Sequence, residues 1–305
     1  MVEVALTAEG LERLRTGALV HRMPAAVFDI SGQGALQCLQ GLLTSDLMKP
    51  PDGSLVYGAL LTPKGLIILD CWVVKQADRF IFITDLDART TAAELFRKQL
   101  PPRLARVTDL TDDWQVYRLF GGGAVVPQVD VDGIVVARRT AAAPFTALVT
   151  GTADAVAHAL KLLAITGART ATSEEWEAAR ILAGWARRGA EIDEKTLVQE
   201  VRFDENGGVS YEKGCYTGQE TVARLHFRGH TNRDLRGLTW SGTEPLTDAK
   251  ITVGEKEVGS VRSILSLPTG RIALALIRRE VETGQVVTAG GSPATVVALP
   301  FTLPN

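Results

Sequence analysis

The stretch Lys213-Gly-Cys-Tyr-Thr-Gly-Gln-Glu220, followed directly by Thr-Val-Ala-Arg224, is the most distinctive part of this 305-residue chain. It places a cation, a thiol, an aromatic ring, two glycines and a carboxylate within eight residues. The run that begins at Gly218 is typical of the first turns of a helix, with Glu220 near the positive end of the helix dipole. Cys215 would then lie just before a helix N-terminus and two residues from Lys213, and both features favour a reactive thiol. The sequence therefore predicts a functional site here.

The residues alone leave the role of this stretch open. In a purely structural reading, Cys215 is buried and Lys213 is paired with Glu220. In a functional reading, the thiol is a nucleophile, a sulfur acceptor or a metal ligand, or it is a redox-sensitive group that regulates the protein. The stretch contains no histidine that could act as a general base beside the thiol.

The octapeptide closely resembles the signature of the YgfZ-type folate-binding proteins, which are relatives of the glycine-cleavage T-protein (aminomethyltransferase) family. Other segments resemble further blocks of these families, up to the end of the chain. They are Ile30-Ser-Gly32, Leu39-Gln-Gly41, Thr44-Ser-Asp46, Leu61-Thr-Pro-Lys-Gly65, Arg180-Ile-Leu-Ala-Gly184 and Ala273-Leu-Ala-Leu-Ile-Arg278. The resemblance implies that Cys215 and Lys213 are the reactive pair of the site, and that the remaining motif residues are Gly214, Tyr216, Gly218, Gln219, Glu220 and Arg224.

The resemblance also implies a fold and a function. The expected fold is α+β, with a T-protein-like three-lobed body around a central cavity and a small antiparallel β-barrel at the C-terminus. The expected function is that of a tetrahydrofolate-binding accessory protein for iron–sulfur cluster assembly or repair in client enzymes, including tRNA-modifying enzymes. Its partners would be folate and either iron–sulfur enzymes or cluster-assembly proteins. Two alternatives stay open: a folate-dependent aminomethyltransferase or other one-carbon transferase, and a non-catalytic thiol-based redox sensor.

Four residues are candidates for the folate pocket. Arg180 resembles an arginine of the T-protein pattern and suits capture of a carboxylate, although an intrahelical pair with Glu177 or a solvated side chain explains it equally well. Tyr211 falls where the T-protein pattern has an aromatic residue and could stack on a pterin, or it could be a half-buried strand residue. Tyr57 and Asp70 lie on either side of the second block and could face the same cavity.

Asp70 is also the clearest departure from the T-protein. Aminomethyltransferases carry paired aspartates shortly after two glycines, whereas this chain has Gly65-Leu-Ile-Ile-Leu-Asp70-Cys71, a single acid shifted along the strand. A shift of one residue turns a side chain to the other face of a sheet. The acid–base geometry of aminomethyl transfer is therefore not expected to be kept, which favours the accessory role over a classical aminomethyltransferase.

Composition restricts the partners and the compartment. A net charge of −2 lacks the basic footprint of a nucleic-acid-binding protein, and no apolar run is long enough to cross a bilayer. The acidic N-terminal residues do not resemble a signal or transit peptide. Three dispersed cysteines suit a reducing cytoplasm, and we expect Cys38 and Cys71 to be buried and inert. Cys215, His226 and His230 lack a fourth ligand, so no metal site is predicted.

Two domains are expected along the chain. The resemblance implies that residues 1–230 form a folate-binding body of two α+β lobes, with a discontinuous N-terminal lobe, and that residues 231–305 form a barrel. Short β runs separated by glycine-rich turns after His230 indicate that barrel. In the body, strands are predicted at 26–30, 55–61, 66–74, 80–83, 104–107, 114–120, 134–137 and 146–149, and helices at 33–43, 87–100, 152–165 and 173–187.

Overall fold

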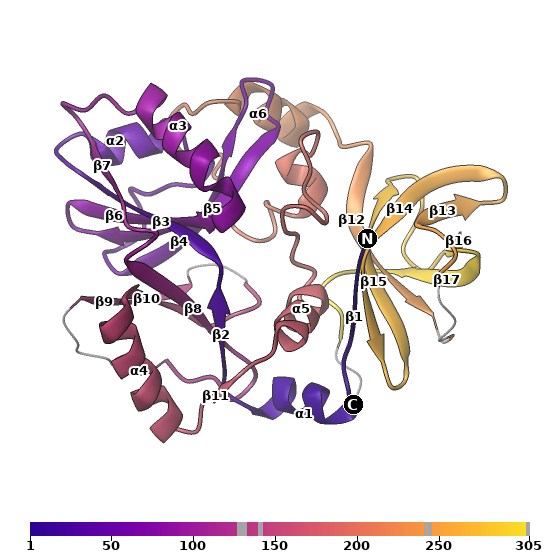
Figure 1. The fold of residues 1–305 in the computed structure, drawn as a ribbon. Helices are drawn as coiled ribbons and strands as arrows, with labels where there is room; N and C mark the ends of the chain where they lie inside the picture. Colours follow the sequence, from indigo (N-terminus) through magenta and orange to yellow (C-terminus); the bar gives the residue numbers. More distant parts are fainter. Residues whose placement is uncertain (127–132, 140–142, 241, 243–245, 303–305) are drawn as a thin grey trace.

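The computed structural model of the chain describes residues 1–126, 133–139, 143–240, 242 and 246–302. Three parts surround the middle of the molecule (Figure 1). Two of them are lobes of one body that share a mixed sheet, and the third is a C-terminal barrel. The predicted α+β class and the antiparallel C-terminal barrel are confirmed.

The sheet of the body runs through both lobes. Its order among the described strands is β11-β2-β8-β10-β9-β4-β5-β6-β3-β7, and the parallel pairing of β4 with β9 joins the first lobe to the second. Branched and aromatic residues dominate the central strands, which suits strands buried on both faces. The bounds are β2 Leu19–Met23, β3 Ala25–Ser31, β4 Ser54–Leu61, β5 Ile67–Gln76, β6 Arg79–Asp85, β7 Arg106–Asp109, β8 Trp114–Phe120, β9 Ile134–Arg139, β10 Ala147–Thr152 and β11 Arg169–Thr170.

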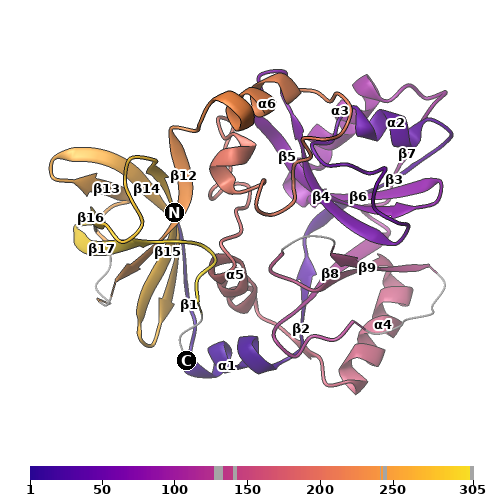
Figure 2. The same ribbon diagram turned by 180° about the vertical axis from the view of Figure 1, so that it is seen from behind.

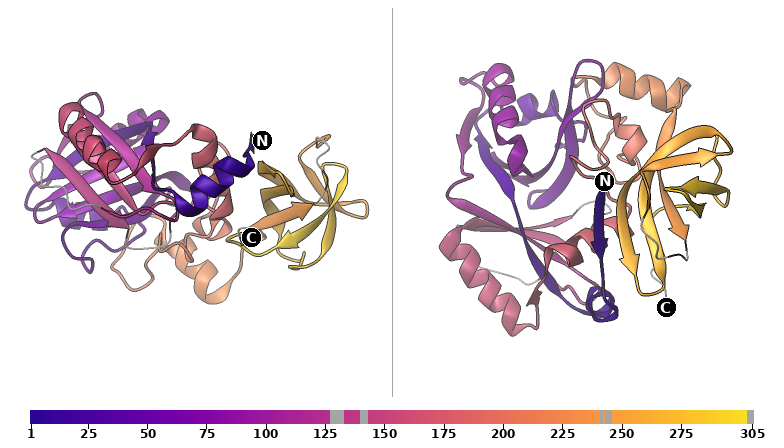
Figure 3. Two further views of the ribbon diagram at one scale, coloured as in Figure 1. Left: turned by 90° about the horizontal axis from the view of Figure 1, so that it is seen from below. Right: turned by 45° about the vertical axis from the view of Figure 1, so that its right-hand side comes forward.

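Helices cover the outer faces of this sheet, and its inner face turns toward the middle of the molecule. Helices α2 (Ala35–Gln40) and α3 (Arg89–Gln99) enclose the core of the first lobe, while α4 (Ala153–Ile165) packs on β8 and β10 of the second (Figure 3). Along each strand, every second side chain points to the inner face instead of to these cores. A central site can therefore be built from the inner face.

The barrel is closed because its long central strands also pair with each other. The strands follow the order β14-β13-β16-β17-β12-β15, and β14 returns to pair with β15. Gly254, Gly284 and Gly290 have positive φ angles of 60°, 90° and 56°, as the predicted glycine turns require. The bounds are β12 Arg233–Trp240, β13 Lys250–Val253, β14 Lys256–Leu267, β15 Gly270–Arg278, β16 Val286–Ala289 and β17 Ser292–Val297.

The N-terminal strand belongs to the barrel sheet, which the sequence did not indicate. Strand β1 (Val2–Ala5) pairs in parallel with β14, with Val2 opposite Ser263. Helix α1 (Ala8–Thr16) then leads from the barrel side to β2 in the body. The predicted body of residues 1–230 therefore sends its first strand across to the other domain.

The segment between the body and the barrel begins with α5 (Ser173–Leu182), whose start is fixed by a capping box between Thr172 and Glu175. An irregular stretch with the 3₁₀ helix η2 (Val198–Val201) follows, and α6 (Gln219–Arg228) precedes β12. Seen from behind, α6 lies at the top between the first lobe and the barrel (Figure 2).

Most of the predicted helices and strands are confirmed, but three of the helices have different boundaries. The helix predicted over 173–187 ends at Leu182, because Gly184 takes a positive φ of 65° that turns the chain. The helix predicted over 33–43 is confined to α2. The helix predicted to start at Asp87 is preceded by the 3₁₀ turn η1 (Leu86–Ala88), which begins after Asp85.

Candidate functional site

Lys213 anchors the octapeptide to the first lobe rather than pairing with a side chain of the motif. Its Nζ donates to the backbone carbonyl oxygens of Gln40, Leu43 and Ser45 at 2.8, 2.6 and 2.9 Å. The side chain is buried, and burial lowers the pKa of Lys213 to about 8, with Asp46 acting in the opposite direction. Three donated hydrogen bonds use every N–H of the ammonium group, so Lys213 serves as a tie between two loops.

Backbone contacts strengthen this tie and bring two of the sequence blocks together. The amide of Thr217 donates to the carbonyl of Gly41 at 3.1 Å, and that of Ser210 donates to Thr44 at 2.9 Å. The block at 39–46 and the octapeptide are therefore one structural unit, although more than 160 residues separate them in the chain.

The second block, 61–65, supports the start of α6 through two glycines. Gly218 precedes the helix with φ of 83°, and a Cβ there would lie 2.6 Å from the carbonyl oxygen of Thr62. Gly65 has φ of 82°, and its own Cβ would lie 2.9 Å from Cβ of Thr221. Both positions need glycine for conformation and for space. The predicted helix start after Gly218 is confirmed, and three sequence blocks meet at this point.

Cys215 is displayed at the surface of this supported loop. Glu220 and Arg224 are exposed as well, whereas Tyr216 is buried with its ring 5.1 Å from Nζ of Lys213. The hydroxyl of Tyr216 has no hydrogen-bond partner among the described residues. The loop thus holds its lysine and tyrosine inside and presents its thiol outside, which differs from the purely structural reading of a buried thiol and a Lys213–Glu220 pair.

A second group of functional side chains lies in the middle of the molecule. A cavity of about 50 Å³ is enclosed by strands β5, β6 and β8 and by the segment from α5 to Arg187. Aromatic rings form much of its wall, including Trp72, Phe145, Trp176 and Trp185. Trp72 and Trp185 are stacked with centroids 5.6 Å apart, and Tyr57 packs 4.6 Å from Trp185. Such a wall suits the faces of a flat ring system.

Acidic groups complete the cavity. Asp70 points to this inner face and accepts a hydrogen bond of 3.0 Å from the hydroxyl of Tyr57. Burial, together with the nearby charge of Asp85, raises the pKa of Asp70 to about 7. Burial raises the pKa of Asp85 as well. The shift of the acid along the strand therefore did not turn it to the outer face, and a carboxyl group that titrates near neutrality lines the cavity.

Arg180 reaches the cavity wall, but its donors are occupied by the protein. Its five N–H groups donate to Glu177 twice, to Glu191, to the carbonyl oxygen of Trp185 and to the hydroxyl of Ser263, at 2.7 to 3.1 Å. The intrahelical pair with Glu177 is thus present, and the side chain is only 1% exposed. Capture of a folate carboxylate by Arg180 stays a prediction, and it would require one of these bonds to break.

Tyr211 does not line the central cavity. Its ring stacks on His226 with centroids 3.6 Å apart, and its hydroxyl donates to Asp204, in a separate surface groove beside the octapeptide. Stacking of Tyr211 on a ligand stays a prediction. Helix α6 ends at Arg228, so His226 and His230 do not share a helical face.

Sequence reasoning missed the residues that make up most of the cavity. Three of the five tryptophans line it, together with Asp85 and Arg118. All of these except Trp185, which follows α5, lie in strands or helices where a core role is the ordinary reading. Arg118, for example, shares the inner face of β8 with the core residues Val116 and Phe120, and alternates with Tyr117 and Leu119 of the outer face. The other cysteines differ from each other: Cys71 is buried, with its pKa raised by burial, whereas Cys38 is only half-buried, contrary to the prediction.

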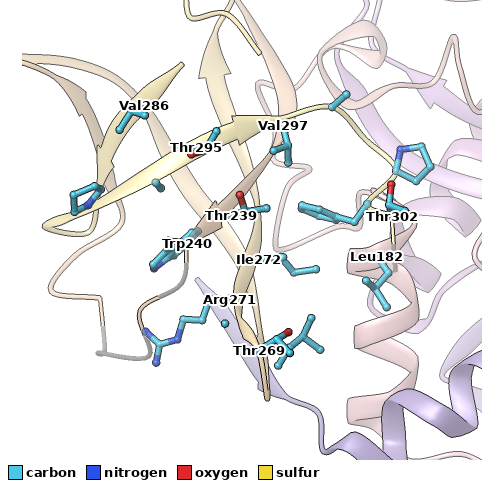
Figure 4. A pocket seen from close by; sticks show the side chains of 17 residues that line it. Leu182, Thr239, Trp240, Thr269, Arg271, Ile272, Val286, Thr295, Val297 and Thr302 are labelled. Atoms are coloured by element: carbon cyan, nitrogen blue, oxygen red, sulfur yellow. The ribbon is translucent and has the colours of Figure 1, made fainter. Parts of the chain in front are cut away.

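A larger pocket lies on the barrel, between β12, β15, β17 and the C-terminal end of α5 (Figure 4). It measures about 840 Å³, and the buried indole N–H of Trp240 on its wall has no acceptor within the described part of the chain. None of the predicted site residues lines it.

The described residues contain neither a cluster that could hold a metal ion nor a helix that could span a membrane. No group of three or more histidine, cysteine, aspartate or glutamate side chains there is placed to hold a metal ion. No helix in the same ranges is long and apolar enough to span a membrane.

Comparisons with known proteins agree with this fold. Residues 9–127 match the GCVT N-terminal domain family. The chain is 27% identical to the tRNA-modifying protein YgfZ of Enterobacter sp. (strain 638), over 91% of each chain. It is 26% identical to the mitochondrial iron–sulfur cluster assembly factor IBA57 homolog of Mycosarcoma maydis, over 72% of this chain and 57% of that protein. The crystal structure of aminomethyltransferase T from Bartonella henselae superposes with a TM-score of 0.82 at 18% identity, covering 97% of this chain and 89% of that one. That likeness shows the fold.

Proposed function

We propose that this chain, which is a YgfZ-type protein related to the aminomethyltransferase T family, binds a reduced folate in its central cavity and supports iron–sulfur clusters in client enzymes. Cys215 is the functional thiol of the proposal, and enzymes that modify tRNA are among the clients. Two relatives, a tRNA-modifying protein and an iron–sulfur cluster assembly factor homolog, support this assignment.

One observation carries the proposal: the thiol and the cavity are separate sites in one molecule. The residues that line the cavity come from the sheet, α5 and the segment that follows, and Cys215 is not among them. Cys215 instead lies at the surface, where a protein partner can reach it. An accessory protein needs this arrangement, because the ligand can stay bound while the thiol meets a client.

The side chains of the cavity fit one end of a tetrahydrofolate. Carboxylates of Asp70 and Asp85 can accept the N–H groups of a pterin ring, and the tryptophan wall suits its faces. A volume of about 50 Å³ holds only a few water molecules, so the aromatic side chains must move apart to admit the ring. Bound tetrahydrofolate would supply a carrier for a one-carbon unit, and the protein groups would orient it and exclude water.

The test separates the two sites by mutation. Tetrahydrofolate and 5-formyltetrahydrofolate are titrated calorimetrically, without oxygen, into wild type, Asp70→Ala and Cys215→Ser. The same variants are expressed in cells that lack the protein, and the activity of an iron–sulfur tRNA-modifying enzyme is measured. We expect Asp70→Ala to lose folate affinity, and Cys215→Ser to bind folate like wild type but fail to support the client.

Cys38→Ser is the matched control, since it removes a half-buried thiol of α2 that packs against the core of the first lobe and does not line the central cavity. It should behave like wild type in both assays. Absence of folate binding by wild type would remove the ligand from the proposal. Full client support by Cys215→Ser would remove the thiol and leave only folate binding.

A folate-dependent one-carbon transferase is the second candidate, and the position of Asp70 favours it. A carboxyl group with a pKa near 7, beside Tyr57 in a water-poor cavity, can exchange a proton with a bound ligand at neutral pH. Turnover with tetrahydrofolate and an aminomethylated lipoyl carrier protein would establish this activity. Loss of that turnover in Asp70→Asn, with folate binding retained, would assign Asp70 as the proton-transfer group.

A further inference from the structure

Three arginines line the cavity among the residues that the structure describes, and Arg118 is the one whose guanidinium group donates no hydrogen bond to the protein. It projects from β8 onto the ring of Trp176, with Cζ 4.0 Å from the ring centroid. Arg180 on the same wall gives all its donors to protein acceptors, and Arg187 bonds to Glu177 and to the carbonyl of Arg188. Arg118 has its five N–H groups available.

The neighbours of Arg118 position it without using its donors. Stacking on an indole fixes the plane of a guanidinium group and leaves its edge free. Burial lowers the pKa of Arg118 to about 10, while the charges of Asp85, Glu177 and Asp70 act to raise it. The group therefore keeps its charge at neutral pH.

A second unsatisfied group lies beside it. His21 stands opposite Arg118 in the antiparallel pairing of β2 with β8. Its ring also stacks on Trp176, with the ring centroids 6.2 Å apart and an angle of 10° between the ring planes. Its buried Nδ1 atom has no hydrogen-bond partner in the described residues. Burial, and then the charge of Arg118, lowers the pKa of His21 to about 4, so the ring is neutral at physiological pH.

We propose that Arg118, held over the ring of Trp176, anchors the ligand of the central cavity by binding a planar group that carries acceptor oxygen atoms. Two parts of a folate have this chemistry, the carboxylates of its glutamate and the carbonyl edge of its pterin. The inference rests on the proposed function, and it assigns the anchoring role to Arg118 in place of Arg180. A free, planar fork of donors suits bidentate binding of such a group.

The experiment measures dissociation constants by calorimetry for wild type, Arg118→Gln and Arg118→Lys. The ligands are 5-formyltetrahydrofolate and 5-formyl-6-methyltetrahydropterin, which has the same pterin ring system but carries no carboxylate. Arg22→Gln is the matched control, because Arg22 is an exposed arginine on β2 next to His21. Thermal unfolding of each variant confirms that it is folded. If Arg118→Gln does not fold, Arg118→Lys, which keeps the positive charge, provides the test.

We expect Arg118→Gln to bind 5-formyltetrahydrofolate about 10- to 100-fold more weakly, the range for loss of a charged hydrogen bond. Arg118→Lys should fall between it and wild type, since an ammonium lacks the planar fork. An equal loss for both ligands assigns the pterin edge to Arg118, and a loss confined to 5-formyltetrahydrofolate assigns the glutamate. Arg22→Gln should match wild type.

Wild-type affinity in both folded Arg118 variants would overturn this inference and leave the proposed function standing. Wild-type protein that binds neither ligand would instead overturn the proposed function, and the inference with it. The two failures are therefore distinguishable.

Discussion

At the scale of single residues, Lys213 has a structural role beside the reactive role predicted for it. Its ammonium group ties the octapeptide to three carbonyls of the first lobe. We expect Lys213→Met to lower the free energy of unfolding by about 2–4 kcal/mol, because buried carbonyls lose charged donors. Urea denaturation measures the change. Lys64→Met, at an exposed position of the second block, should leave the stability within about 0.5 kcal/mol of wild type.

If Lys213→Met were as stable as wild type and only lost client support, the lysine would have a chemical role that the three hydrogen bonds do not explain.

Asp70 makes the stability of the protein depend on pH. Its pKa in the folded state, about 7, is higher than the ordinary value of 3.8, so the folded protein binds the extra proton. The stabilising effect of that proton is complete below about pH 4 and is lost as the pH rises through 7. Asp70→Asn has no such proton to lose. Relative to wild type, it should become more stable with rising pH, by up to about 4 kcal/mol at pH 8.

Urea denaturation of both proteins from pH 4 to pH 8 gives this difference directly. Asp52→Asn, at an exposed position, should show a constant offset from wild type over the same range. A constant offset for Asp70→Asn too would mean that the carboxyl group is already ionised at low pH, which its burial opposes.

At the scale of elements, the start of α6 depends on one glycine of the octapeptide and not on the other. A Cβ at Gly218 would lie 2.6 Å from the oxygen of Thr62, at a φ of 83°, whereas a Cβ at Gly214 meets nothing within 4 Å. We expect Gly218→Ala to cost about 1–3 kcal/mol of stability and to change the rate at which iodoacetamide alkylates Cys215.

Gly214→Ala is the matched control and should change neither quantity appreciably. Equal effects of the two substitutions would show that the loop is held by something other than its close packing on the block at 61–65.

Arg180 of helix α5 forms a buried ion pair with Glu191, with 2.9 Å between nitrogen and oxygen. Ser263 of strand β14 is hydrogen-bonded to both side chains and so connects the pair to the barrel. Arg180→Met should cost about 3–5 kcal/mol, because Glu191 is then left buried without its counter-charge. Adding Glu191→Gln to this variant should restore part of the loss. A double-mutant cycle by urea denaturation measures the coupling, and additive effects would contradict it. Arg169→Met, at an exposed position of β11, is the control.

The contrast between these elements explains how much the sequence could predict. The octapeptide was found because its composition fits no core, and the strands because their periodicity is local. The cavity was only partly found because Arg118, Asp85 and Trp72 lie on strands among core residues, and one sequence does not show which side chains face each other across the fold. For the same reason Arg180 was identified by its block, whereas its four hydrogen-bond acceptors, Glu191 and Ser263 among them, lie outside that block.

At the scale of the whole molecule, the cavity belongs to the body, and none of the described residues that line it comes from the barrel. Residues from β5, β6, β8 and α5 line the cavity, while the barrel is connected through Ser263 of β14 and through β1. A ligand in the cavity should therefore slow local opening in the body, with little effect on strands at the far side of the barrel.

Hydrogen exchange with and without 5-formyltetrahydrofolate tests this. Amides of β5, β8 and α5 that exchange by local opening should slow markedly, and those of β16 and β17 should keep their rates. Arg118→Gln, studied at the same ligand concentration, should show less protection in the body. Protection confined to β12, β15 and β17 would instead place the ligand in the 840 Å³ pocket beside Trp240, and the central cavity would have to be given up as the folate site.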